Sequence, residues 1–332
     1  MVAKLKAGFL GLLVFFTFYN YEEYCFIPLK PNESFFSQYY RENSSDSIKV
    51  LLGQRLFFDS IMSRDYSLSC ATCHLPTKAF TDGKAKSVGI RQQQVGRNAP
   101  SLANVVDQDS GLHWDRGVPS LEMQVLVPVQ EHAEFDFDLR LIAERMKKNV
   151  SYLHLSNKAY QIDPNPFVIT HAIACFERTL ISNQSEFDQY ITGDLDALNS
   201  SQKKGMKLFF QDLYCSRCHN GKNFSNFSLQ NNGLYRLKYP NDSGRMRITY
   251  LEQDRDKFKV PSLRNVAITS PYMHDGSIET LEAVIDHYAS GGKIHPNKSH
   301  FIKAFDINPE EKKNLIDFLK ALTDTSFISK KY

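Results

Sequence analysis

The sequence predicts a mainly α-helical chain made of two similar modules that arose by tandem duplication. Three observations predict this class: a CxxCH motif occurs twice, a similar apolar segment precedes both copies, and a similar proline-led segment follows both. Internal repeats of this kind indicate two copies of one structural unit. The 332 residues suit two modules of about 100 to 150 residues each with a leader and linkers.

The two CxxCH motifs are what covalent attachment of c-type haem requires. The cysteines form thioethers with the porphyrin, and the histidine binds the iron. One CxxCH alone could be half of a zinc site or a redox dithiol, but two copies in repeated sequence favour haem. Each module is therefore expected to surround one covalent haem c. The attachment residues are Cys70, Cys73 and His74 in the first copy and Cys215, Cys218 and His219 in the second.

The segments around the two motifs match in order and spacing. GQRLFF stands before the first motif and GMKLFF before the second, and each is expected to be part of a helix. After the motifs, PSLANV begins at Pro100 and PSLRNV at Pro261. Each of these prolines is followed 13 residues later by a histidine, His113 or His274. The duplication therefore extends well beyond the haem motifs.

Hydrophobic periodicity predicts helices joined by long connections. The expected helices cover about 45–58, 121–127, 138–148, 166–182, 200–211, 279–289 and 309–322. The Asn-rich stretch 220–257 has weak periodicity and is expected to be loop with at most short strands. We expect the N-terminal haem module, the peroxidatic one, over residues 45–165 and the C-terminal, electron-transferring module over residues 166–332.

Residues 1–44 are expected to lie outside both modules. Lys4 and Lys6 precede an apolar run from Ala7 to Phe18. The run is shorter than the roughly 20 residues of a membrane span and is typical of a signal peptide. Residues 1–22 are interpreted as a signal peptide or, alternatively, an uncleaved N-terminal membrane anchor, and residues 23–44 as a polar lead-in. Export to the periplasm fits the haems, because bacteria attach c-type haem on that side of the membrane.

Composition indicates a globular redox protein. The net charge is only +3, which the four propionates of two haems would about cancel, and we expect no nucleic-acid partner. Haem attachment consumes four of the six cysteines and leaves Cys25 and Cys175. Nothing in the sequence supports a disulfide between them, and Cys175 lies in an apolar helical pattern typical of a core residue.

Comparing the two copies indicates the other axial position of each iron. Seven residues after the Leu-Glu pair, the first copy has Pro128 and the second has Tyr288. Proline cannot bind iron, whereas a tyrosine phenolate can. We therefore expect the second haem to be bound by His219 and Tyr288, and the first by His74 alone, open to a small oxidant. Met273 is the weaker alternative to Tyr288.

These residues resemble the bacterial dihaem cytochrome c peroxidase superfamily, and within it the MauG-like branch, from about residue 45 to about residue 322. The motifs are LFFD before the first CxxCH, RNAP at 97–100, ACFERTLIS at 174–182 and LRNVAITSPYMHDG at 263–276. Ordinary peroxidases of the family usually have methionine in place of Tyr288. They also have a histidine that plugs the first haem, where this chain has Ile90. Both departures point to the MauG-like branch.

The resemblance implies roles for three residues near the first haem. Gln124 and Glu134 match the spacing of the family's glutamine and catalytic glutamate. Glu134 is expected to be a general acid/base that takes a proton from one peroxide oxygen and returns it to the other; Glu131 and His132 are lesser candidates. Trp114 resembles the family tryptophan that relays electrons between the haems, although a lone tryptophan is more often a core anchor.

The family also binds calcium between the modules, with residues that match the Asn98 side chain and the backbone carbonyls of Thr269 and Pro271. Such oxygens suit a hard cation. Asn98 could also cap a turn before Pro100. His274 is expected near the second haem without binding its iron. The remaining histidines are expected to be structural or on the surface: His113, His154, His171, His287, His295 and His300.

Three functions are compatible with these features. The leading one is a periplasmic dihaem peroxidase, an oxidoreductase that reduces hydrogen peroxide to water with electrons from a small cytochrome c or cupredoxin, passed through the second haem. The alternative is a MauG-like oxidase that uses peroxide to oxidise a side chain of a partner protein, which Tyr288 and the missing plug histidine favour. The third is a dihaem electron carrier without catalysis, against which Gln124 and Glu134 argue.

Overall fold

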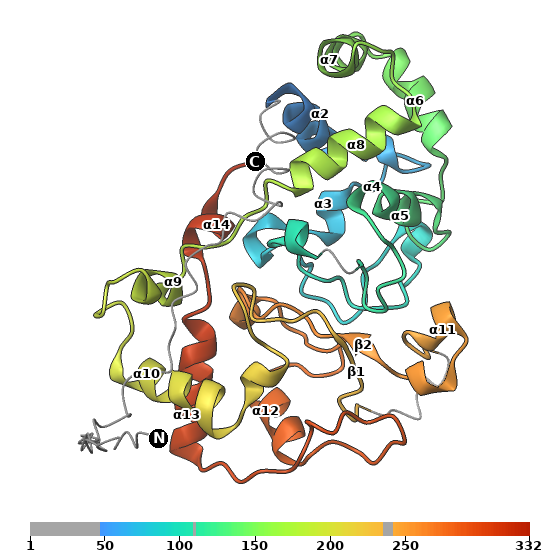
Figure 1. The fold of residues 1–332 in the computed structure, drawn as a ribbon. Helices are drawn as coiled ribbons and strands as arrows, with labels where there is room; N and C mark the ends of the chain where they lie inside the picture. Colours follow the sequence, from blue (N-terminus) through green and yellow to red (C-terminus); the bar gives the residue numbers. More distant parts are fainter. Residues whose placement is uncertain (1–46, 109–110, 235–241) are drawn as a thin grey trace, which may run out of the picture.

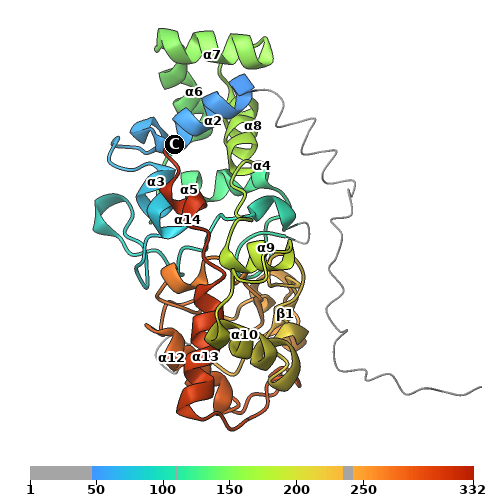
Figure 2. The ribbon, with the colours of Figure 1, turned by 90° about the vertical axis from the view of Figure 1, so that its left-hand side faces the viewer.

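The computed structural model describes residues 47–108, 111–234 and 242–332, which form a mainly helical protein of two lobes (Figure 1). A view from the side shows the lobes stacked and joined by segments next to α9 (Glu186–Ile191) and α14 (Thr325–Ser329) (Figure 2). The expected leader 1–22, the lead-in 23–44 and Cys25 lie outside the described residues. No helix in the described ranges is long and apolar enough to cross a membrane.

The first lobe holds the helices up to α8, and the second holds those from α10 to α13. The first contains α2 (Ser47–Phe58), α3 (Cys70–Cys73), α4 (Leu121–Gln124), α5 (Leu126–Gln130), α6 (Leu139–Lys147), α7 (Val150–Tyr160) and α8 (Pro166–Glu177). The second contains α10 (Ser200–Lys207), α11 (Met246–Thr249), α12 (Leu281–Ala289), α13 (Pro309–Lys320), and the strands β1 (Leu229–Gln230) and β2 (Phe258–Lys259). The strands pair antiparallel, with Leu229 opposite Lys259.

Each lobe contains one pair of closely packed helices. In the first lobe α2 packs against α8, and in the second α10 packs against α13. The repeated glycine of the sequence lies at each contact. A Cβ atom at Gly53 would lie 1.8 Å from the carbonyl oxygen of Ala172, and one at Gly205 would lie 1.9 Å from that of Asn314. Any larger residue would force the helices apart, so glycine has the same structural role in both lobes.

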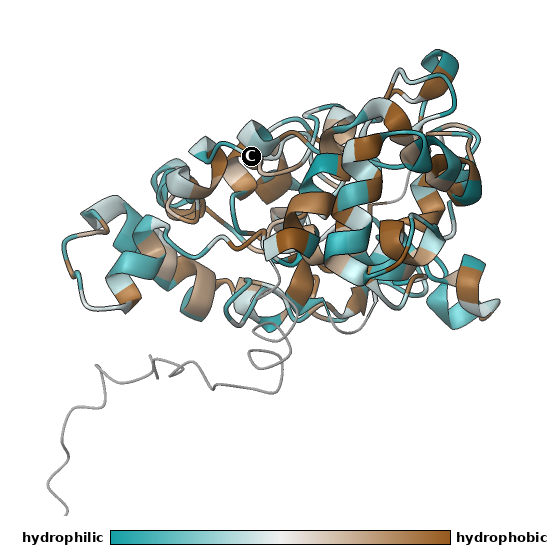
Figure 3. Cartoon of the chain, turned by 90° about the horizontal axis from the view of Figure 1, so that it is seen from above, coloured by the Kyte–Doolittle hydropathy of each residue, from teal (hydrophilic) through white to brown (hydrophobic). Residues whose placement is uncertain are grey.

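The second helix of each pair also begins in the same way. An asparagine followed by proline starts both α8 and α13. The Asn165 side chain accepts a hydrogen bond from the Val168 amide at 3.2 Å, and that of Asn308 accepts one from the Glu311 amide at 2.9 Å. Such caps satisfy amides that have no partner within the helix, and proline suits the first helical position. Colouring by hydropathy shows helices with both hydrophobic and hydrophilic stretches (Figure 3).

The hydrophobic cores divide the chain differently from the expected boundary at 165/166. The buried residues of α8, including Ile169 and Phe176, pack with those of α2 in the first core. The end of the chain returns to the same core, where the Tyr332 ring lies 5.2 Å from that of Phe80. The second core is formed mainly by α12, α13 and the phenylalanines Phe187, Phe209 and Phe224. The modules 45–165 and 166–332 thus remain a proposal, and packing favours a boundary after Leu180, which still belongs to the first core.

Local geometry also corrects the register of the repeat. The equal 13-residue steps suggest that His113 corresponds to His274. In the structure, however, an isolated antiparallel β-bridge joins Leu112 to Val118 in the first copy, and the equivalent β-bridge joins Tyr272 to Ile278 in the second. The Asp115 and Asp275 side chains then accept equivalent hydrogen bonds, from the amides of residues 117 and 277. Trp114 is therefore the counterpart of His274, because one residue is missing before the turn in the second copy.

Six of the seven helices expected from periodicity are present with ends shifted by a few residues, whereas the expected helix 121–127 is divided at Val125 into α4 and α5. The expected helix 166–182 stops at Glu177, because the Asn104 side chain accepts a hydrogen bond from the Ser182 amide at 2.8 Å and holds this segment in an extended path. The helices α3, α7, α9, α11 and α14 were not predicted. The short helix α11 lies within 220–257, where only loop and short strands were expected. Side-chain caps start α7, α9 and α14, from Asn149, Ser185 and Asp324.

Candidate active site

The first CxxCH motif lines a cavity of about 80 Å³ in the first lobe. Residues far apart in the sequence meet there, from α3 and from the segment that includes α4 and α5. Apolar side chains such as Phe57 and Val129 form much of the rest of the wall. The sequence-predicted residues that line this cavity are Cys70, Cys73, His74, Gln124, Pro128 and Glu134.

Both motif histidines are held so that one ring nitrogen remains for a metal. His74 Nδ1 lies 2.8 Å from the carbonyl oxygen of Phe80, and His219 Nδ1 lies 3.0 Å from that of Phe224. Burial lowers the pKa of His74, and it lowers the pKa of His219 to about 4, so both rings are neutral at pH 7. A neutral imidazole whose Nδ1 donates to a carbonyl presents Nε2 as a ligand.

The motif cysteines also fit covalent haem. Cys70, Cys73, Cys215 and Cys218 are all free thiols, as thioether formation requires. Burial raises the pKa of Cys73 to about 11 and that of Cys215 to about 12, so these side chains are not acidic thiolates of a redox dithiol. The fifth free cysteine, Cys175, is buried in α8 as a core residue.

Glu134 lies in the first cavity, and the pKa of its carboxyl group is raised. Burial, and to a lesser extent the nearby Glu131 carboxylate, raise the pKa of Glu134 to about 7. The Ile90 amide donates to the Glu134 carbonyl oxygen at 3.0 Å and fixes the backbone. A carboxyl group with a pKa near neutrality can both accept and donate a proton at pH 7, which is what a general acid/base needs.

The lesser acid/base candidates point away from this cavity. Glu131 and His132 are exposed, and His132 Nδ1 pairs with the Asp136 carboxylate at 2.7 Å. Ile90, at the place of the family's plug histidine, is buried. Of the described residues that line the first cavity, His74 is the only histidine. The described wall thus offers no second imidazole as an iron ligand.

Glu177 also lines this cavity, although the sequence did not predict it as a site residue. It ends α8, is 4% exposed, and burial raises its pKa to about 8. Its Oε2 atom has no hydrogen-bond partner in the described part of the chain. The only signal in the sequence was its place directly after Phe176, the last residue of an apolar helical run. The first cavity therefore contains two carboxyl groups of raised pKa, Glu134 and Glu177.

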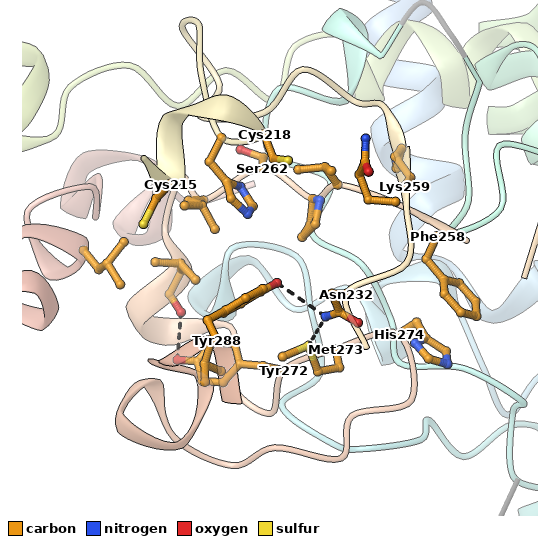
Figure 4. A pocket seen from close by; sticks show the side chains of 18 of the residues that line it. Cys215, Cys218, Asn232, Phe258, Lys259, Ser262, Tyr272, Met273, His274 and Tyr288 are labelled. Atoms are coloured by element: carbon orange, nitrogen blue, oxygen red, sulfur yellow. Dashed lines mark hydrogen bonds between the residues drawn. The ribbon is translucent and has the colours of Figure 1, made fainter. Parts of the chain in front are cut away.

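The second CxxCH motif lines a larger cavity of about 290 Å³ (Figure 4). Cys215 and Cys218 lie on one side of it, and Tyr288 and Met273 on the other. Burial raises the pKa of Tyr288. The side-chain amide of Asn232 donates to both residues: its Nδ2 atom lies 3.4 Å from Tyr288 Oη and 3.4 Å from Met273 Sδ. The expected ligand Tyr288 and its weaker alternative Met273 thus share a donor that the sequence did not predict.

Trp114 lines the second cavity and connects the lobes. Its Nε1 donates to the carbonyl oxygen of Asn98 at 2.9 Å, and the amide of Asn98 donates to the carbonyl oxygen of His274 at 2.9 Å. The His274 ring stacks on Phe258, with ring centroids 3.6 Å apart. His113, expected to be structural or on the surface, is half-buried and lines this cavity, where desolvation lowers its pKa to about 4.

The three residues proposed for calcium, Asn98, Thr269 and Pro271, line the second cavity. Asn98 Nδ2 donates to the carbonyl oxygen of Lys84 at 2.8 Å, which leaves the side-chain oxygen of Asn98 as the atom able to bind a cation. Within the described ranges, no three or more His, Cys, Asp or Glu side chains gather as a metal site. A calcium site made of amide and carbonyl oxygens remains a proposal.

Two haem-attachment motifs, each at a buried cavity in a helical protein, define the class: a c-type cytochrome with two haem sites. A family model described as di-haem cytochrome c peroxidase matches residues 47–196. The chain is 36% identical over 278 residues to the methylamine utilization protein MauG of Methylorubrum extorquens, covering 82% of this chain and 78% of the relative. It is 34% identical over 276 residues to the cytochrome c551 peroxidase of Nitrosomonas europaea, covering 82% and 79%. The chain therefore belongs to the di-haem cytochrome c peroxidase family.

Solved structures agree with this assignment. The crystal structure of a MauG-like protein associated with microbial copper homeostasis has a TM-score of 0.80 and 32% identity, covering 85% of this chain and 91% of that one. The diheme peroxidase BthA from Burkholderia thailandensis has a TM-score of 0.75 at 21% identity, covers 85% and 87%, and supports the fold alone. Family membership makes this chain an oxidoreductase that acts on peroxide and carries two covalently bound haem c groups.

Proposed function

We propose that this protein reduces hydrogen peroxide to water at the first haem, with electrons that pass through the second haem. The observation that carries this proposal is Glu134, a carboxyl group with a pKa of about 7 in the cavity of His74. Pro128 occupies the position that corresponds to Tyr288, so this wall of the first cavity offers no iron ligand. An electron carrier without catalysis would need neither feature.

In this mechanism, the polar residues of the first cavity divide into those that would hold the haem and those that would act on peroxide. Cys70, Cys73 and His74 would hold the haem, which would supply the redox chemistry toward peroxide when bound. Glu134 takes a proton from one peroxide oxygen and returns it to the other, so that the second oxygen leaves as water. Overall, one H₂O₂, two electrons and two protons give two molecules of water. Gln124 adds an amide that can orient peroxide by hydrogen bonding.

A second candidate function is favoured by Tyr288 and by Ile90 at the plug position. A MauG-like oxidase would use the same peroxide chemistry but withdraw the electrons from a side chain of a partner protein. Steady-state assays distinguish the two. Fast peroxide consumption with a reduced small cytochrome c or a reduced cupredoxin supports the peroxidase. Slow consumption with such donors, together with oxidation of a candidate partner protein, supports the oxidase.

We propose a periplasmic location, since haem c is attached there in bacteria and the sequence begins with a signal-like segment. The expected partners are hydrogen peroxide and either a small electron donor or a protein substrate. A calcium ion at Asn98, Thr269 and Pro271 would lie where Asn98 joins the two lobes, and we propose that it holds them together. We propose membrane contact only through an uncleaved N-terminal anchor.

Replacing Trp114 with phenylalanine should slow electron transfer between the haems. Trp114 donates to the Asn98 carbonyl oxygen and lines the second cavity, and we propose that its indole lies on the electron path between the two sites. We expect peroxide still to react at the first haem, while the response of the second haem or turnover with donor becomes slower. Rapid mixing with peroxide, followed at both haems, measures this.

The variant also loses the hydrogen bond to Asn98, which should cost about 0.5–1.5 kcal/mol of stability. The melting temperature is therefore measured alongside the rates. A destabilised Trp114→Phe variant whose second haem responds as fast as in the parent would show that Trp114 only fills the space between the lobes.

A further inference from the structure

One end of the second cavity carries a buried lysine. Lys259, in β2, lines the cavity and is 6% exposed. Its backbone amide donates to the carbonyl oxygen of Trp114 at 2.6 Å, and its Nζ atom donates to the side-chain oxygen of Gln108. Lys259 is therefore fixed beside Trp114, with its ammonium group turned into the protein interior.

The described protein gives this ammonium group no carboxylate partner. None of the ion pairs within 4.0 Å among the described residues involves Lys259, and the nearby carboxylate of Asp115 is already engaged by Arg97 at 2.8 Å and Arg247 at 2.6 Å. Burial, reinforced by the positive charge of Arg116, lowers the pKa of Lys259 to about 7. A buried charge is costly unless it is paired, so the site favours an anion close to Lys259.

The other lysine and arginine side chains on the cavity wall differ from Lys259: Lys303 is exposed, and Arg264 and Arg217 have other contacts. Arg264 binds the Asp188 carboxylate through two hydrogen bonds of 2.8 Å. Arg217 is exposed, and its guanidinium group lies over the Tyr214 ring at 4.6 Å. Other parts of the wall are apolar, formed by Leu281, Val284, Ile285, Leu315 and Leu319. The cavity thus combines a large apolar surface with a buried cation, which matches an apolar ring that bears carboxylates on one edge.

We propose that Lys259 binds a propionate carboxylate of the second haem and thereby directs the propionate edge of that haem toward Trp114. Lys259 is a positioning residue: it acts on the haem and does not contact peroxide. Its positive charge offsets the propionate charge and so favours the reduced form of the haem. The assignment concerns the cofactor and holds for either of the two proposed activities.

The test replaces Lys259 with methionine, which keeps the length of the side chain and removes its charge. The midpoint potential of the second haem is measured by redox titration, followed through its low-spin signal. We expect the equilibrium to shift toward the oxidised haem about tenfold, which is about 59 mV for a one-electron couple. Resonance Raman spectra should also show altered propionate bending modes. Lys207→Met, at an exposed position of α10, is the matched control and should change neither property.

If Lys259→Met attaches both haems and its second haem keeps the parent potential and propionate modes, the proposal is wrong. If the variant fails to retain the second haem, Lys259→Arg and Lys259→Gln decide. Recovery of haem content and potential by arginine but not by glutamine supports a charge contact. Recovery by both, or by neither, would show that side-chain packing and not the charge is what matters there. Haem content, potential and Raman modes are all read without peroxide, so failure here leaves the proposed function untouched.

Discussion

Replacing Glu134 with glutamine should lower the rate of the reaction with peroxide by about 10² to 10⁴, the range that a positioned acid/base group contributes. Glutamine has nearly the same shape but cannot take up and return the proton. Both haems should remain attached, because Glu134 holds neither of them. Stopped-flow mixing of the oxidised protein with hydrogen peroxide measures the rate, and absorption spectra confirm the haem content.

The pH profile of the same reaction gives a second readout. Since the pKa of Glu134 is raised to about 7, its carboxylate form grows as the pH rises through that value, and the rate should rise with it. The glutamine variant should lose this rise.

Two carboxyl groups nearby provide controls for Glu134→Gln. Glu131 is exposed, and Glu131→Gln should leave the rate near that of the parent. Glu177 lies in the same cavity with a pKa raised to about 8, so Glu177→Gln tests whether any buried carboxyl group would serve. Our assignment expects a large loss only for Glu134. If Glu134→Gln reacts with peroxide as fast as the parent while Glu177→Gln reacts slowly, the acid/base group is Glu177 and not Glu134.

Replacing Tyr288 with methionine should raise the reduction potential of the second haem. Tyr288 and His219 line the same cavity, and an anionic phenolate stabilises oxidised iron more than a thioether does. Axial ligands change haem potentials over a range of about 0.8 V, so we expect an increase on the order of 0.1 V or more. The variant should then behave more like an ordinary peroxidase. A spectroelectrochemical titration measures the change.

Tyr272→Phe is the matched control for Tyr288→Met. Tyr272 lies in the same cavity, but its hydroxyl donates to the carbonyl oxygen of Val266 at 3.0 Å, so its removal should leave the potential unchanged. An unaltered spectrum and potential in Tyr288→Met would remove Tyr288 from the ligand set. Met273 would then be the next candidate, since it shares the Asn232 donor with Tyr288.

The sequence predicted the parts of this protein that depend on local patterns. The repeated apolar segments are helices because periodicity reports which side of a helix is buried, and Gly53 and Gly205 mark the same close helix contact in both lobes. Cys70, His74 and Glu134 meet in one cavity as expected, since motif spacing and family resemblance both reflect the fold around the haem.

Other features depend on contacts between distant segments, which no local pattern shows. Asn232 lies in a weakly patterned loop, yet its amide reaches Tyr288 in α12. The correspondence of Trp114 with His274 was hidden by a one-residue deletion, which equal residue counts cannot detect. The α8 helix was grouped with the second module because it follows the first in the chain, while its apolar face packs on α2.

The central claim is that the first haem is open to peroxide in the oxidised protein while Tyr288 closes the second. Electron paramagnetic resonance of the fully oxidised protein as isolated, before any reductant is added, tests it most directly. With Pro128 at the position that corresponds to Tyr288 and Ile90 at the plug position, we predict one high-spin and one low-spin haem signal. Two low-spin signals in that sample would contradict the account.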